Sequence, residues 1–142
     1  MNDDLNYQTV EDTENWFGVS EASANPICDK SFAFALTTIN LYKRLQEARE
    51  FVISKQLLRS GTSIGANVQE ATAAESRRDF IHKMTLASKE ARESMYWLRL
   101  LAESNLAPGL DVTTELAQAH ELVRMLTSIV KSTSRSKKEP KR

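Results

Sequence analysis

Two short stretches of the sequence hold residue types that suit chemistry, and the first suggests a metal site. A carboxylate-bridged metal pair in a helical bundle uses a Glu from each of two helices and a Glu-x-x-His pair from each of the other two. The run Asp79-Phe-Ile-His82 approximates one such pair, but His120 has Ala117 three residues before it. Two histidines cannot complete the set, so we expect no metal and no cofactor, and a surface or capping role for His82.

The second stretch, RSGTSIGANVQEA at residues 59–71, combines glycines with hydroxyl side chains and raises the question of phosphate binding. A P-loop needs G-x-x-x-x-G-K-[ST] after a strand. Only three residues separate Gly61 from Gly65, and Ala66 and Asn67 stand where the Lys and the hydroxyl residue belong. A G-x-S-x-G turn of the hydrolase type is also missing. We therefore expect a protein that is not an enzyme, with no catalytic residue and no small-molecule substrate identified.

The same stretch is better explained as helix. The apolar register that starts at Ile53 and Leu57 continues through Gly61 to Ile64 and Val68 without a break. Helix costs several kcal/mol here, at up to about 1 kcal/mol for each Gly, Ser, Thr or Asn relative to Ala, so tertiary contact must offset it. Small side chains at this spacing let another helix approach closely, with ligand binding as the alternative. The expected helix-packing residues are Gly61, Ser63, Ile64, Gly65 and Asn67.

Apolar residues recur every three or four positions in four segments of the chain. In none of these segments do apolar and polar residues alternate with the two-residue period of a strand. The predicted helices run from Asp29, as N-cap, to about Gln46, and then over 50–74, 76–105 and from a cap at Asp111 onward. Short connections favour an all-α, antiparallel, up-and-down four-helix bundle with flexible N- and C-terminal arms. The predicted core stripes are Phe32, Ala35, Leu36, Ile39 and Tyr42 on the first helix, Ile53, Leu57, Ile64, Val68 and Ala71 on the second, Phe80, Met84, Ala87, Ala91, Met95, Leu98 and Ala102 on the third, and Val112, Leu116, Ala119, Val123, Leu126 and Val130 on the fourth.

Several helices carry more apolar residues than one inward stripe needs. On the first helix a second set lies about 180° around from the predicted core stripe. Aligned apolar residues on more than one helix indicate a partner surface, and self-association is the simplest partner. The expected oligomer interface consists of Phe34, Leu41, Leu45, Phe51, Leu58, Leu86, Trp97 and Leu100.

The overall composition fits one small domain in a reducing compartment. The chain has 142 residues, a formal net charge of zero and one cysteine, Cys28, so an internal disulfide is excluded. No run approaches the roughly 20 apolar residues that cross a bilayer, and we expect a cytoplasmic protein with no membrane association. The predicted organisation is an acidic arm at residues 1–28, a bundle at 29–131 and a basic tail at 132–142.

The basic residues suggest a second kind of partner. Lys and Arg side chains that neutralise phosphates release counterions, which would let the tail bind RNA or DNA, although a tail that only solubilises is the alternative. Arg77, Arg78 and Lys83 would extend such a patch at the start of the third helix. The candidate nucleic-acid-binding residues are these three together with Arg135, Lys137, Lys138, Lys141 and Arg142.

Two long segments carry a family resemblance. FVISKQLLRSGTSIGANVQEA (residues 51–71) and SRRDFIHKMTLASKEARESMYWLRLL (residues 76–101) resemble the four-helix-bundle proteins encoded in intervening sequences of bacterial 23S ribosomal RNA genes. The resemblance runs from about Lys30 to Val130 and implies an antiparallel four-helix bundle that assembles as a ring-like homopentamer. The accessory variability proteins of diversity-generating retroelements are more distantly similar, and they bind nucleic acid and a reverse transcriptase. The long acidic N-terminal arm departs from the compact family core.

Residues and resemblance together give two expected functions. The first is a non-enzymatic, self-assembling helical bundle that serves as a binding or scaffolding module. The alternative is an accessory nucleic-acid-binding protein that uses the basic tail and the assembled surface.

Overall fold

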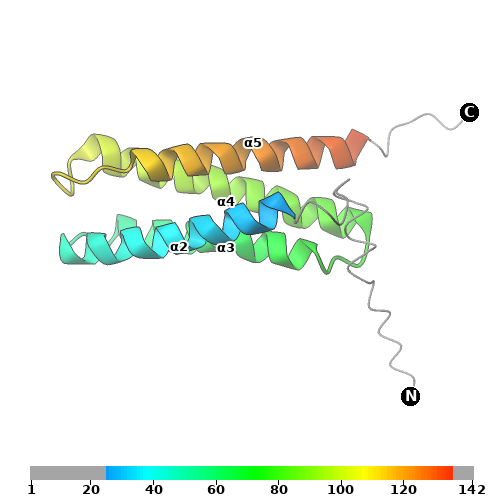
Figure 1. Ribbon diagram of the computed structural model, residues 1–142, viewed down its shortest axis with the longest axis horizontal. Coiled ribbons are helices and arrows are strands. Elements are labelled where there is room, and N and C mark those ends of the chain that lie inside the picture. The colour runs from blue at the N-terminus through cyan, green and yellow to red at the C-terminus, as the bar shows by residue number, and fades with distance from the viewer. Residues whose placement is uncertain (1–24, 136–142) are drawn as a thin grey trace, which may run out of the picture.

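Four helices run back and forth along a common axis in the computed structural model, which describes residues 25–135 (Figure 1). They are α2 (Pro26–Glu47), α3 (Ile53–Ala71), α4 (Arg77–Ser104) and α5 (Thr113–Arg135). Each helix packs against the next one along the chain, and α5 returns to α2. The predicted all-α antiparallel bundle is confirmed. Both predicted arms fall largely outside the described residues.

The helix boundaries differ from the expected ones at two starts and two ends, and one of these ends is that of α3, at Ala71 instead of residue 74. Helix α2 begins at Pro26, three residues before the predicted cap, because proline fits the first turn of a helix, where its missing N–H is not needed. Asp29 then lies inside that first turn, where a carboxylate is favourable beside the positive end of the helix dipole. Helix α5 continues to Arg135, four residues past the predicted end of the bundle.

Helix α3 begins at Ile53 instead of residue 50 because Glu50 caps it from outside. The buried Glu50 carboxylate accepts hydrogen bonds from the backbone N–H groups of Val52 (3.1 Å), Ile53 (2.9 Å) and Ser54 (2.6 Å). Burial alone would raise the pKa of Glu50, but these backbone donors favour the charged form and the net pKa is lowered. The first N–H groups of α3, which have no partner within the helix, are satisfied in this way.

The other two helix starts are capped by side chains as well. Ser76 Oγ accepts a hydrogen bond from the Asp79 N–H at 3.0 Å, and the Asp79 carboxylate accepts one from the Glu75 N–H at 3.2 Å. Asp111 Oδ1 accepts from the Thr113 N–H at 2.9 Å, which confirms the predicted cap of the last helix. Asp79, half of the only approximate metal-ligand pair in the sequence, is thus explained by the start of α4.

The core is formed by apolar side chains from all four helices. On α3, α4 and α5 the predicted stripes turn inward, with Ile64, Phe80 and Leu126 fully buried among them. On α2 the prediction is wrong, since the opposite face turns inward: Phe34, Leu41 and Leu45 are buried, whereas the predicted stripe of Phe32, Leu36 and Ile39 is exposed. The exposed fractions of these last three side chains are 66%, 49% and 36%.

The Glu50 cap predicts a pH-dependent stability. Replacing Glu50 with Ala should lower the free energy of unfolding at pH 7 by about 1–2 kcal/mol, because the first N–H groups of α3 lose their charged acceptor. A thermal melt should show a midpoint about 3–8 °C lower. The folded pKa of Glu50 lies below its ordinary value of 4.5, so its contribution is present above that pH and is lost as the pH falls below it.

The measurement is the difference in melting temperature between wild type and Glu50→Ala from pH 7 down to pH 3. That difference should narrow as the pH falls. Glu47→Ala is the control, because Glu47 is exposed. A constant difference across the range would show that the carboxylate of Glu50 does not act as the cap.

Candidate interaction surfaces

The glycine-rich stretch of α3 forms a close contact with α2. Residues 59–68 lie within α3, which confirms their helical interpretation. A Cβ built on Gly61 would lie 2.7 Å from both Cγ2 and Oγ1 of Thr38, and one on Gly65 would lie 3.3 Å from the carbonyl oxygen of Ser31. Thr38 is buried, and its hydroxyl donates to the Phe34 carbonyl at 2.8 Å, so its side chain has little freedom to move away. Any side chain larger than hydrogen at residue 61 would hold α2 and α3 apart.

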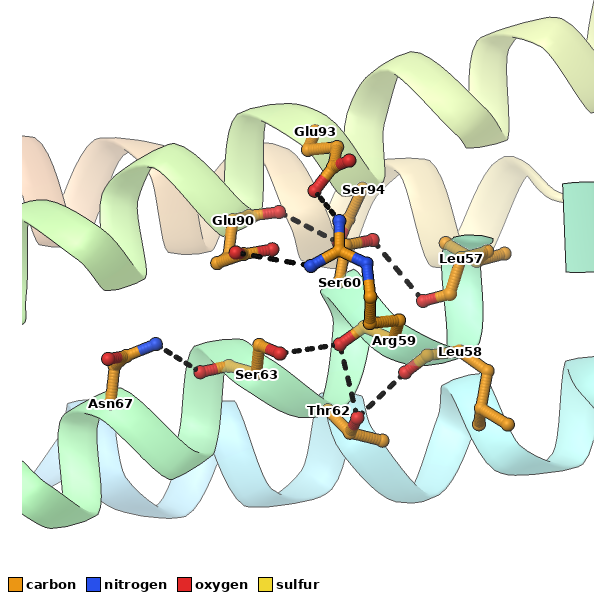
Figure 2. A network of polar contacts seen from close by, with 10 residues as sticks. All are labelled: Leu57, Leu58, Arg59, Ser60, Thr62, Ser63, Asn67, Glu90, Glu93 and Ser94. Atoms are coloured by element: carbon orange, nitrogen blue, oxygen red, sulfur yellow. Dashed lines mark hydrogen bonds and ion pairs between the residues drawn. The ribbon is translucent and has the colours of Figure 1, made fainter. Parts of the chain in front are cut away.

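Polar groups of the same stretch face α4 or bond back to their own helix. Figure 2 shows the buried hydrogen bond between Ser60 Oγ and Ser94 Oγ, 2.9 Å long, which joins α3 to α4. Ser63 Oγ donates to the Arg59 carbonyl at 2.7 Å, and Asn67 Nδ2 donates to the Ser63 carbonyl at 2.9 Å. Of the expected packing residues, Gly61, Ile64 and Gly65 therefore turn toward the bundle interior, whereas Ser63 and Asn67 are half-buried and bond within α3.

An ion-pair cluster covers the α3–α4 contact from outside. The Arg59 guanidinium pairs with Glu93 and, at 3.5 Å, with Glu90 (Figure 2). Burial, followed by a hydrogen bond with Glu93, raises the pKa of Glu90 against the opposing effect of Arg59. The hydrogen bond to Glu93 in turn raises the pKa of Arg59. These carboxylates are engaged between α3 and α4.

Three large apolar residues on one face of α2 are exposed. We call Phe32, Leu36 and Ile39 the α2 stripe; these residues follow one another at four- and three-residue steps and share one helix face. Phe51 and Val52, in the connection before α3, are also exposed.

The structure corrects part of the expected oligomer interface. Phe34, Leu41 and Leu45 lie in the core of the protomer and are not available to a partner. The reason is steric, because their face also carries Ser31 and Thr38, which are small enough to meet the glycines of α3. Phe51 is exposed as expected, and the remaining members of that set, Leu58, Leu86, Trp97 and Leu100, are half-buried.

Trp97 combines an apolar contact with an unsatisfied donor. Its ring packs against the core and lies edge-on to Tyr96, with ring centroids 5.1 Å apart. Its Nε1 is buried, and no acceptor lies within hydrogen-bonding distance among the described residues.

Two of the expected nucleic-acid-binding residues have partners within the protein, and their expected binding role stays a prediction. Arg77 Nη2 donates to the Thr133 carbonyl at 2.7 Å and ties the start of α4 to the end of α5. Lys83 pairs with Glu70 of α3 at 2.7 Å, and this hydrogen bond raises the pKa of Lys83. Arg78 is exposed. The expected tail residues Lys137, Lys138, Lys141 and Arg142 lie outside the described residues.

A groove beside α5 gathers cations that the sequence reading did not single out. We call it the basic groove; it has a volume of about 490 Å³. Arg92 of α4 borders it and is held in place by a 3.4 Å hydrogen bond from its Nη2 to Thr127 Oγ1. Only Arg135 of this set was an expected binding residue; Arg92 belongs to α4 and joins the cations of α5 only when the two helices pack. The lining residues are Arg92, Val123, Arg124, Thr127, Ser128, Lys131, Ser132 and Arg135.

Other candidate chemistry is sparse in the part of the chain that the structure describes. Over residues 25–135, no three His, Cys, Asp or Glu side chains come together in a group that could hold a metal ion. Cys28 is half-buried, and burial together with the neighbouring Asp29 raises the pKa of its thiol, which disfavours the reactive thiolate. None of the helices within these residues is long and apolar enough to cross a membrane.

Comparison with known proteins shows that residues 24–128 match one protein family. This segment matches the sequence profile described as 23S rRNA-intervening sequence protein. The chain is also similar to a crystal structure of a protein of unknown function from the S23 ribosomal protein family of Bacteroides thetaiotaomicron VPI-5482. The two share 48% sequence identity with a TM-score of 0.71, and the match covers 75% of this chain and 96% of that one. No curated protein matches significantly.

The α2–α3 contact predicts a destabilising effect of the smallest possible side chain. Gly61→Ala should lower the free energy of unfolding by up to about 2 kcal/mol, because crowding of about 1–3 kcal/mol against Thr38 outweighs the roughly 1 kcal/mol that alanine gains as a helix former. Chemical denaturation provides the measurement.

Two further variants make the cause specific. Gly65→Ala should be milder, since its nearest neighbour would lie at 3.3 Å. Thr38→Ala should cost less in the Gly61→Ala background than in wild type, because it removes the crowding atoms. An alanine at residue 61 that stabilises the protein would contradict the close contact.

Proposed function

Because this chain belongs to the family of 23S rRNA-intervening sequence proteins, we propose that it is a helical module that assembles with copies of itself and binds partners instead of catalysing a reaction. The α2 stripe is the observation that carries this proposal. Three large apolar side chains on one helix face stand in water although the rest of α2 buries a complete core face.

Removing the α2 stripe from water would favour association. Apolar surface contributes about 25 cal/mol per Å² when it is buried, and aligned exposed residues of this size typically mark a protein interface. The stripe continues into charged residues, since Asp29 stands three residues before Phe32 and Lys43 four residues after Ile39, both exposed. These opposite charges at its two ends would fix the direction in which a neighbouring helix docks.

The occupant that we propose for the stripe is a second copy of the chain. The formal net charge of zero means that copies do not repel one another strongly. A closed ring of more than two subunits needs two different surfaces on each protomer. The half-buried Leu86, Trp97 and Leu100 on α4 supply an apolar surface distinct from the stripe. Five subunits are proposed from the resemblance to relatives that form homopentamers.

A binding role, instead of a catalytic one, also fits the carboxylates of the bundle, because they stabilise the structure. Asp79 and Glu50 cap helices, and Glu90 and Glu93 hold Arg59. Each of these carboxylates has a structural task. We therefore propose a scaffold whose surfaces, and not an internal site, perform the function.

Self-assembly is tested with two variants of the same residue type. In Leu36→Glu, an unpaired carboxylate would be buried in the interface at a cost of several kcal/mol, so assembly should be lost. In Leu106→Glu, the same change is made in the α4–α5 connection, where the exposed fraction is 53% compared with 49% at Leu36. Light scattering coupled to size-exclusion chromatography measures the mass.

Wild type and Leu106→Glu should elute at a multiple of 16.0 kDa, fivefold for the pentamer, and Leu36→Glu at 16.0 kDa. Circular dichroism confirms that each variant remains helical. A wild-type monomer at 100 µM, or a Leu36→Glu variant with the wild-type mass, would refute the proposal.

A further inference from the structure

The geometry points to a polyanion-binding site in the basic groove, and we propose that its ligand is the phosphate backbone of a nucleic acid. Four cationic side chains from two helices border this one groove, namely Arg92, Arg124, Lys131 and Arg135. The proposal does not depend on self-assembly, because a single protomer contains the whole groove.

The groove cations are not neutralised by the protein. Among residues 25–135, none of the four takes part in an ion pair. Both acids of α5 pair with cations of α2 instead, Glu115 with Arg44 at 2.9 Å and Glu121 with Lys30. The acids in the middle of α4 face α3 and bind Arg59. A surplus of positive charge is therefore left on the α4–α5 side.

The arrangement suits a chain of phosphates better than a single phosphate. Arg124, Lys131 and Arg135 are seven and four residues apart, so they lie along one face of α5 and span about 16 Å of its axis at 1.5 Å per residue. One phosphate group cannot contact side chains spread over this length. Successive phosphates of a nucleic-acid strand, which rise about 3.4 Å per nucleotide in a duplex, can be contacted at several points.

The remaining lining residues favour nucleic acid over a membrane. Thr127, Ser128 and Ser132 place hydroxyl groups between the cations, and hydroxyl, Arg and Lys side chains are the usual partners of phosphate oxygens. Membrane-surface helices need a row of large apolar residues beside their cations. The groove has only Val123 in that role.

The Arg92 position strengthens the assignment to a built site. A 3.4 Å hydrogen bond to Thr127, which is on the other helix and 35 residues away in the sequence, places the exposed guanidinium of Arg92 beside the groove.

The test is fluorescence anisotropy with a labelled 20-nucleotide single-stranded RNA, the DNA of the same sequence and its duplex, at 50–300 mM KCl. Full-length wild type should bind with a log–log salt slope of about −3, as expected for about four phosphate contacts. The double variant Arg124→Gln/Lys131→Gln should bind at least about tenfold more weakly at 100 mM KCl, and its slope should be less steep by about 2.

Two matched double variants control for total charge. Arg49→Gln/Lys55→Gln removes two exposed cations from the α2–α3 connection and α3, and Lys137→Gln/Lys138→Gln removes two lysines of the tail. Both should retain more of the wild-type affinity than the groove variant, while circular dichroism shows equal helix content.

Four outcomes would overturn the assignment. The first is that none of the nucleic acids binds at 50 mM KCl, and the second is that the groove variant and the controls lose the same amount of affinity. The third is that the wild type binds phosphatidylserine vesicles or poly-glutamate at least as tightly as nucleic acid. Loss in the tail variant alone would place the site in the tail and also reject the groove. Because these readouts do not involve mass, they are separable from a failure of self-assembly.

Discussion

The contact of Gly61 with Thr38 is the constraint on which the arrangement of this bundle depends. The glycine hydrogen leaves just enough space for a threonine side chain whose hydroxyl is committed to its own helix. Four residues along α3, Gly65 repeats the arrangement against the Ser31 backbone. Because Ser31 and Thr38 must meet the glycines, the face of α2 that carries them turns inward. The large apolar residues on the other face of α2 are left in water.

Each contact between two helices uses a different kind of residue, and this determines which charged residues remain on the outer surface. Close packing of small residues joins α2 to α3, and a buried serine pair with an Arg59 ion cluster joins α3 to α4. The α2–α5 seam is spanned by ion pairs, among them Arg44 with Glu115. Carboxylates of α4 and α5 therefore lie at these helix–helix contacts. Positive charge is left on the remaining side, where the basic groove lies.

Two surfaces with different chemistry result, and they share no residue. The α2 stripe is apolar and suits a second copy of the chain, whereas the basic groove of α4 and α5 suits a polyanion. An assembly formed through the stripe would carry one groove per subunit, and linked weak sites gain affinity through effective concentration. Self-association and polyanion binding are therefore compatible on this scaffold.

The sequence by itself determined the four helices and most of the core, because apolar spacing and capping residues are local properties that are read directly from the chain. Asp111 and the stripes through Ile64, Phe80 and Leu126 are examples. It also showed that residues 59–71 are a helical surface and not a P-loop. The sequence could not predict which face of α2 turns inward, because both faces are apolar. The choice depends on which face has small residues opposite the glycines of another helix. The sequence could not predict the groove for a similar reason, because Arg92 and Lys131 come together only after α4 and α5 have packed. It also could not show that Arg77 donates a hydrogen bond to a carbonyl 56 residues away.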